Sequence, residues 1–311
     1  MRKKSKKNLY KILITWRLLV DSINKYSSIL KKYKIRYDTV SCKQHMSEKK
    51  LLKIIHKYDG IICGDDELTQ KVLSRAKKLK IISKWGTGID SIDKNYANKK
   101  QILLKNSPGA FSKSVAQHAI ALIFSLLRNI VDNHNDIASG IWTKRICQTI
   151  ENKTIGIIGL GKIGNEIYKK ISVFDVNFIF NDIKKIKKTN SSLKTLLKKS
   201  DIVIISCDLN KTSKYLLKYK ELSLMKKNAI LINISRGAIV NNIDLIKILK
   251  LKKIAAAGLD VFENEPLKKN NKFLRLKNCV LTSHNAFNSK ELIEEINLKS
   301  VFNIINFFKS V

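Results

Sequence analysis

The sequence is 311 residues long and 44% hydrophobic, which is enough for buried cores in two domains and excludes wholesale disorder. It has no run of about eighteen uncharged apolar residues, so no obvious membrane-spanning helix is expected. Its five scattered cysteines lack a Cys-x-x-Cys spacing, so neither a disulfide framework nor a zinc site is expected. The formal net charge is +36, but only eight of the 61 basic residues are arginine, and the lysines are spread along the whole chain. This distribution favours a solvated surface over a specific nucleic-acid site, and the cysteine pattern favours the cytoplasm.

Short β-type runs alternate with lysine-rich helical stretches over nearly the whole chain. The first series of expected strands is Lys11–Thr15, Arg36–Val40, Gly60–Cys63, Ile81–Lys84 and Ile102–Leu104. The second series is Thr154–Ile158, Asn177–Asn181, Ile202–Ser206, Ala229–Asn233, Ala255–Leu259 and Cys279–Thr282. Helical patterns lie between them, for example at Glu67–Leu79, Ile163–Phe174 and Ile243–Leu249. The alternation predicts an α/β protein with two doubly wound parallel-sheet domains of Rossmann-like or flavodoxin-like type.

A break in the pattern separates the two series. Pro108 and Gly109 interrupt the chain just before an expected long helix, Lys113–Ala138. That helix could link the domains and offer an apolar face to a partner subunit. A final amphipathic helix, Lys290–Phe308, follows the last strand and is expected to pack back on the first domain.

The strongest local motif is a glycine-rich turn after the strand Thr154–Ile158. Gly159, Gly161 and Gly164 form Gly-x-Gly-x-x-Gly where the strand runs into a helix. Gly159 permits the tight turn, Gly161 leaves room for a pyrophosphate, and Gly164 lets the helix pack close to the strand. The motif therefore predicts a dinucleotide site.

An acidic residue, Asp182, closes the next expected strand. Its carboxylate is placed to accept hydrogen bonds from the adenosine ribose and to repel a 2′-phosphate, which favours NAD over NADP. Lys184 and Lys185 follow directly and could tolerate that phosphate, so NADP stays an alternative.

Three polar groups follow later strands, at the sheet edge where cofactor and substrate meet in open α/β folds. Arg236 is suited to hold a substrate carboxylate, and His284 to move a hydroxyl proton during hydride transfer. Glu265 would hold the imidazole and favour its charged form. Two rivals stay open: Glu263 for the carboxylate and His118 for the base, although His118 lies on an apolar helical stretch and is more typical of a packing histidine.

These motifs resemble the D-isomer-specific 2-hydroxyacid dehydrogenase family, most closely its phosphoglycerate dehydrogenase-like branch, over practically the whole chain. The resemblance includes the segments 84–90, 106–109, 114–118, the glycine fingerprint, the Ser-Arg-Gly turn and the run 259–266. It implies that Arg236, Glu265 and His284 are the catalytic residues. The implied cofactor contacts are Thr87, Gly159, Gly161, Lys162, Ile163, Gly164, Asp182, Cys207, Ile234, Ser235 and Asp260. The implied substrate contacts are Lys84, Gly86, Thr87, Gly88, Arg236 and His284.

The resemblance also implies a discontinuous substrate domain, formed by residues 1–106 and 289–311, with an NAD-binding domain at 107–288. The implied protein is a homodimer, and its activity is NAD-dependent interconversion of a D-2-hydroxy acid and its 2-keto acid. A basic segment, Trp142 to Arg145, lies where phosphoglycerate-type enzymes have a clamp, which makes 3-phosphoglycerate a candidate substrate. A non-catalytic NADH-sensing scaffold, as among the family's corepressors, is the alternative, while no specific nucleic acid or membrane is expected as a partner.

Overall fold

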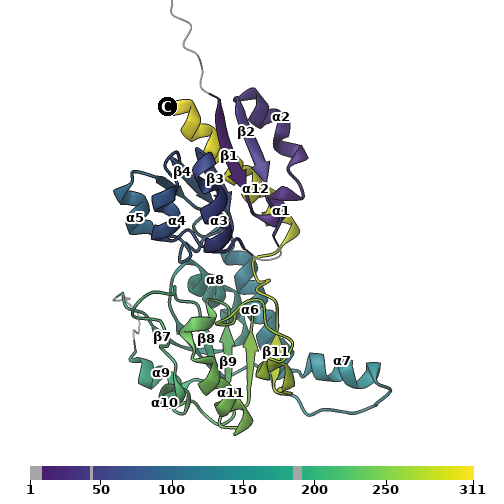
Figure 1. Ribbon diagram of the computed structural model, residues 1–311. Coiled ribbons are helices and arrows are strands. Elements are labelled where there is room, and N and C mark those ends of the chain that lie inside the picture. The colour runs from purple at the N-terminus through teal and green to yellow at the C-terminus, as the bar shows by residue number, and fades with distance from the viewer. Residues whose placement is uncertain (1–8, 43–44, 185–190) are drawn as a thin grey trace, which may run out of the picture. The chain divides into compact units, whose positions relative to one another are not determined.

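The computed structural model describes residues 9–42, 45–184 and 191–311 (Figure 1). The chain divides into two compact units, one made of residues up to Phe111 together with Ser289–Val311, the other of Ser112–Asn288. Each unit has its own parallel sheet and its own buried core.

The sheet of the first unit has five strands in the order β2-β1-β3-β4-β5, all paired in parallel. The strands are β1 (Tyr10–Ile14), β2 (Ile35–Thr39), β3 (Gly60–Cys63), β4 (Ile81–Lys84) and β5 (Leu103–Lys105). The helices of the unit are α1 (Arg17–Val20), α2 (Asn24–Lys32), α3 (Glu48–Ile54), α4 (Gln70–Arg75), α5 (Lys94–Lys99) and α12 (Lys290–Ser310). The last helix of the chain thus belongs to the unit formed by the first residues.

Side chains alternate across the sheet of the first unit, as the two-residue period of a strand requires. Leu13 joins one core cluster, with residues of α3, α4 and α5. Ile12 and Ile14 join the opposite cluster, with residues of α1, α2 and α12. Because both faces are covered, the central strand β3 is fully buried, whereas the edge strands β2 and β5 are largely not.

The sheet of the second unit has six parallel strands in the order β11-β10-β9-β8-β6-β7. They are β6 (Thr154–Ile158), β7 (Asn177–Asn181), β8 (Ile202–Ile205), β9 (Ile230–Asn233), β10 (Ala256–Leu259) and β11 (Cys279–Leu281). Its helices are α6 (Ser112–Leu127), α7 (Ile130–Ala138), α8 (Lys162–Ile171), α9 (Leu193–Lys199), α10 (Tyr219–Leu222) and α11 (Asn242–Lys250). The strand order reverses between β6 and β8, and such a switch point is where open α/β sheets bind ligands.

The helix expected over Lys113–Ala138 is two helices, so that prediction is wrong. α6 and α7 meet at an angle of 61°. Asn129 lies between them at φ 49°, in the left-handed region, which asparagine tolerates better than most residues. In the described ranges no single helix has the length and apolar composition to span a membrane, although α6 and α7 pass that test as a bent pair.

Candidate active site

The glycine turn of the second unit follows β6 and leads into α8. Gly159 has φ 92°, and a Cβ there would lie 2.5 Å from the backbone nitrogen of Cys207, which follows β8. A Cβ on Gly164 would come within 2.2 Å of the Gly159 carbonyl oxygen. At Gly161, the N-cap of α8, a Cβ would meet nothing within 4 Å. The turn is therefore tight on its inner side and open where the helix presents its first amides, as a bound pyrophosphate requires.

Asp182 lies directly beside this turn. Its carboxylate accepts hydrogen bonds from the backbone N–H of Leu160, at 2.7 Å, and of Lys184, at 2.8 Å. The side chain is thus fixed against the Gly-x-Gly segment, where a carboxylate suits a ribose and disfavours a 2′-phosphate. Lys185, the other lysine weighed for a 2′-phosphate, lies outside the described residues.

Replacing Asp182 with serine should therefore relax the preference for NAD. Loss of the negative charge removes repulsion of the NADP phosphate, and each 1.4 kcal/mol of repulsion removed is about tenfold in selectivity. We expect the ratio of kcat/KM for NADP to that for NAD to rise at least about tenfold, measured by steady-state kinetics with each cofactor. An unchanged ratio would show that Asp182 does not select the cofactor.

The carboxyl ends of β8 and β9 are tied together. The Ser235 hydroxyl donates a hydrogen bond to the Cys207 carbonyl. Burial raises the pKa of the Cys207 thiol to about 11, so this thiol stays protonated near neutral pH and is not a nucleophile. Ile234 is buried, so its side chain serves packing.

Arg236 and Glu265 are carried by adjoining loops. Asn233 donates to the Arg236 carbonyl at 3.1 Å, and the Arg236 guanidinium donates to the Ser235 carbonyl at 2.9 Å. A Cβ on Gly237 would lie 1.9 Å from the carbonyl carbon of Phe262, so only glycine lets these loops approach so closely. The Phe262 N–H in turn donates to Glu265 at 2.9 Å.

The His284 imidazole contacts Glu265 directly. Its Nδ1 lies 2.7 Å from Glu265 Oε2, and both side chains are 20% exposed. If Nδ1 donates its proton to the carboxylate, Nε2 is left for a reacting group. The rival carboxylate, Glu263, instead accepts from the Asn242 N–H at 2.7 Å, at the start of α11.

Asp260 lies fully buried beneath the histidine. Its carboxylate accepts from the Thr282 hydroxyl at 2.5 Å and from the N–H groups of Asn285 and Ala286 at 2.8 and 3.0 Å. Burial acts to raise the pKa of Asp260, but these hydrogen bonds and one from His118 hold it below its ordinary value. The carboxylate is therefore ionised at neutral pH.

In the first unit the predicted substrate contacts surround the turn after β4. Lys84 is 4% exposed, donates to the Trp85 carbonyl at 3.0 Å and pairs with Asp65 at 3.1 Å. Gly86 has φ 116°, and the Thr87 carbonyl accepts from the Asn106 amide at 2.7 Å. The turn is thus held by internal bonds, and its backbone can supply amides to a carboxylate.

Aromatic rings adjoin the turn after β4. Trp85 stacks on Trp16 with ring centroids 4.7 Å apart and contacts Phe111 at 5.4 Å. A Cβ on Gly64 would meet the Trp16 ring at 2.2 Å, so glycine leaves the space that this indole fills. No sequence spacing predicts this aromatic cluster, because Trp16, Trp85 and Phe111 are far apart along the chain.

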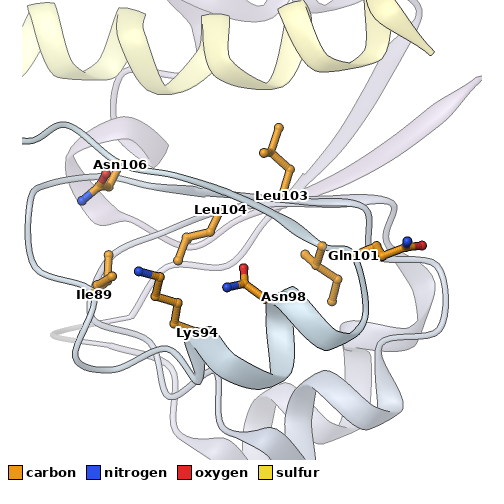
Figure 2. A pocket seen from close by; sticks show the side chains of 8 residues that line it. Ile89, Lys94, Asn98, Gln101, Leu103, Leu104 and Asn106 are labelled. Carbon is orange, nitrogen blue, oxygen red and sulfur yellow. The ribbon is translucent and has the colours of Figure 1, made fainter.

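A surface hollow of about 510 Å³ lies at the edge of the first unit's sheet (Figure 2). Leu103 and Leu104 of β5, Lys94 and Asn98 of α5, and Asn106 line it. None of its lining residues is a predicted catalytic or cofactor residue, so we do not assign it to the reaction. Within the described residues no cluster of three or more histidine, cysteine or acidic side chains could hold a metal ion.

The site has the parts of a dinucleotide-dependent oxidoreductase. The sequence profile described as the D-isomer specific 2-hydroxyacid dehydrogenase NAD binding domain matches residues 120–286. A glyoxylate reductase of Thermofilum pendens is 37% identical over 255 residues, 77% of this chain and 75% of the relative. The chain belongs to the D-isomer specific 2-hydroxyacid dehydrogenase family. Its cofactor is accordingly NAD, and its class is that of the oxidoreductases.

Two further relatives define the scope of this likeness. A D-3-phosphoglycerate dehydrogenase of Archaeoglobus fulgidus is 33% identical over 282 residues, 88% of this chain but 54% of the relative. The chain thus spans about half the length of that protein. A structure of the D-lactate dehydrogenase from Aquifex aeolicus, complexed with NAD and lactic acid, matches with a TM-score of 0.87 and 25% identity, covering 96% of each chain.

Proposed function

We propose that this chain reduces a small, unphosphorylated 2-keto acid to the D-2-hydroxy acid with NADH, and catalyses the reverse oxidation with NAD. The observation that carries the proposal is the Glu265–His284 contact of 2.7 Å, on the same sheet edge as the glycine turn and Asp182. The reaction needs a dinucleotide and one proton donor beside it, and this edge supplies residues for both.

The dinucleotide, when bound, would supply the hydride as NADH or accept it as NAD, and the residues of the chain bind and orient the substrate and exchange the proton. The glycine turn and the first turn of α8 hold the phosphates, and Asp182 holds the ribose. The Arg236 guanidinium grips the substrate carboxylate through two parallel hydrogen bonds. His284 holds the proton at Nε2 and exchanges it with the substrate oxygen, while Glu265 fixes the ring through Nδ1.

An unphosphorylated substrate is favoured because Arg145, in the expected basic clamp, and Lys84, an expected substrate contact, already have carboxylate partners. Lys84 pairs with Asp65. Arg145 makes two hydrogen bonds to Asp136, at 2.8 and 3.0 Å. Each pair would have to separate before a phosphate could bind.

A panel of keto acids tests this proposal. We expect NADH oxidation with glyoxylate, pyruvate and hydroxypyruvate, with kcat/KM at least about tenfold above that for 3-phosphohydroxypyruvate, which corresponds to about 1.4 kcal/mol. A preference for the phosphorylated acid would contradict the substrate assignment. Tight NADH binding without turnover of any acid would contradict the enzymatic function and support the scaffold alternative.

We also propose that the protein is a homodimer joined through residues 130–149, called the arm below. α7 has no buried residue, and in Figure 1 it extends away from the sheet of its unit. The arm exposes large apolar side chains, with Trp142 84% and Ile146 97% exposed. Several exposed large apolar side chains within one short segment are typical of a protein interface. The family resemblance indicates that the partner at this surface is a second copy of the chain.

We propose the cytoplasm as the compartment of the protein, which agrees with its free cysteines.

The double replacement Trp142→Ser and Ile146→Ser should shift the protein from dimer to monomer in sedimentation velocity. Ile243→Ser is the matched control, because Ile243 is 79% exposed on α11, away from the arm in sequence. A dimer that survives the double replacement, or a wild-type monomer, would contradict the assigned interface.

A further inference from the structure

Two side chains of α6 face the segment 282–286, here called the histidine loop because it carries His284. Ser114 and His118 lie four residues apart and so share one face of the helix. The Ser114 hydroxyl donates to the Ala286 carbonyl at 2.8 Å. His118 Nε2 lies 3.0 Å from the Thr282 hydroxyl oxygen and 3.4 Å from Asp260 Oδ1. One helix therefore holds the histidine loop at both ends.

The proton positions in this cluster follow from the donors available. Thr282 has one hydroxyl proton, which it donates to Asp260 at 2.5 Å. Its oxygen can therefore only accept from His118, so Nε2 of His118 carries a proton. That N–H also faces the buried Asp260 carboxylate. The result is a linked set, in which His118 donates to Thr282 and Thr282 donates to Asp260.

The loop needs such support because its backbone is strained at His284. His284 has φ 53°, in the left-handed region that non-glycine residues rarely adopt. The Asp260 carbonyl accepts the His284 N–H at 2.8 Å, and its carboxylate accepts the next two amides. These bonds hold the turn that aims the imidazole at Glu265. Asp260 can hold this turn only while its carboxylate is itself held in position by its hydrogen-bond partners.

We infer that His118 and Ser114 are positioning residues for His284: through Asp260, Thr282 and Ala286 they hold the histidine loop in the conformation that the proton transfer needs. This inference rests on the proposed function. It replaces the expectation that His118 merely packs in the core. A residue with this role acts mainly on the chemical step, because the hydrogen bonds of Ser114 and His118 go to the histidine loop. Asp260, which His118 also faces, is an expected cofactor contact, so NADH affinity is measured alongside kcat.

Matched substitutions of His118 test the inference in the full-length protein. His118→Leu keeps an apolar body but removes the N–H, whereas His118→Gln retains a donor at similar reach. We expect the leucine variant to lose about 10–100-fold in kcat, since a misplacement near 1 Å can cost 10²-fold, with a smaller fold-change in the dissociation constant of NADH. The glutamine variant should recover most of that loss. With NADH deuterated at the transferred position, the isotope effect on kcat should be larger for leucine than for wild type.

A second substitution keeps the test decisive if His118→Leu does not fold. Ser114→Ala removes the bond to Ala286 and should lower kcat in the same direction, while Ser114→Thr, which keeps the hydroxyl, should not. Wild-type kcat and isotope effect in both His118→Leu and Ser114→Ala would overturn the inference, as would equal losses for leucine and glutamine. Failure of the proposed function is a different result, because the wild-type protein would then turn over no 2-keto acid.

Discussion

Replacing His284 with alanine should lower kcat by about 10²–10⁴-fold, the usual contribution of a positioned general acid or base. The imidazole is the group that the structure places against Glu265, with Nδ1 at 2.7 Å from the carboxylate. The alanine variant would lack the group to which the proton exchange is assigned. The dissociation constant of NADH should stay close to the wild-type value, because the glycine turn and Asp182 are untouched.

Steady-state kinetics and fluorescence titration with NADH check this expectation together. His56→Ala is a suitable control, since His56 is exposed in the first unit and has no place in the predicted site. Near-normal turnover by His284→Ala would contradict the assignment of the proton donor. Loss of NADH binding along with activity would instead indicate a structural role for His284.

Replacing Arg236 with lysine should lower kcat/KM by about 10²-fold or more, although the positive charge is kept. A guanidinium offers two parallel N–H donors to a carboxylate, whereas an ammonium is a compact point charge on a flexible stem. The backbone around Arg236 is fixed by Asn233 and by the close approach of Gly237 to Phe262, so a lysine there cannot adjust its position freely.

Kinetics with glyoxylate and pyruvate measure this effect, with Arg275→Lys as the control, since Arg275 is exposed on the short helix 272–275. Both kcat and KM should change in the Arg236 variant, because the two parallel N–H donors of the guanidinium orient the substrate as well as binding it. Wild-type kinetics would contradict the assigned role of Arg236 in gripping the carboxylate.

The strands could be predicted from the sequence almost residue by residue. Each of the eleven strands in the described structure begins and ends within one residue of its expected bounds, and β3, β4, β6 and β7 agree at both ends. Apolar, β-branched runs bounded by polar turns leave little freedom in placing a fully buried parallel strand. The residues of the second unit's site follow from this, because each lies just after a strand.

The helices and the polar partners were harder to predict, because they depend on tertiary contacts. The helix expected at Glu67–Leu79 covers only Gln70–Arg75, since Thr69 caps its start and Leu68 instead bridges to Ile92. Neither the pairing of Lys84 with Asp65 nor that of His118 with Asp260 has a spacing signal. Ser114 did lie in a quoted motif, but only the folded chain places it against Ala286.

A single-turnover experiment shows whether an imidazole held by Glu265 serves hydride transfer to a keto acid. The protein is loaded with one equivalent of NADH and mixed rapidly with glyoxylate in a stopped-flow instrument. We expect complete oxidation of the bound NADH by the wild-type protein, and none on the same timescale by His284→Ala with NADH bound. Equal oxidation by both proteins would contradict it, as would bound NADH that no 2-keto acid oxidises.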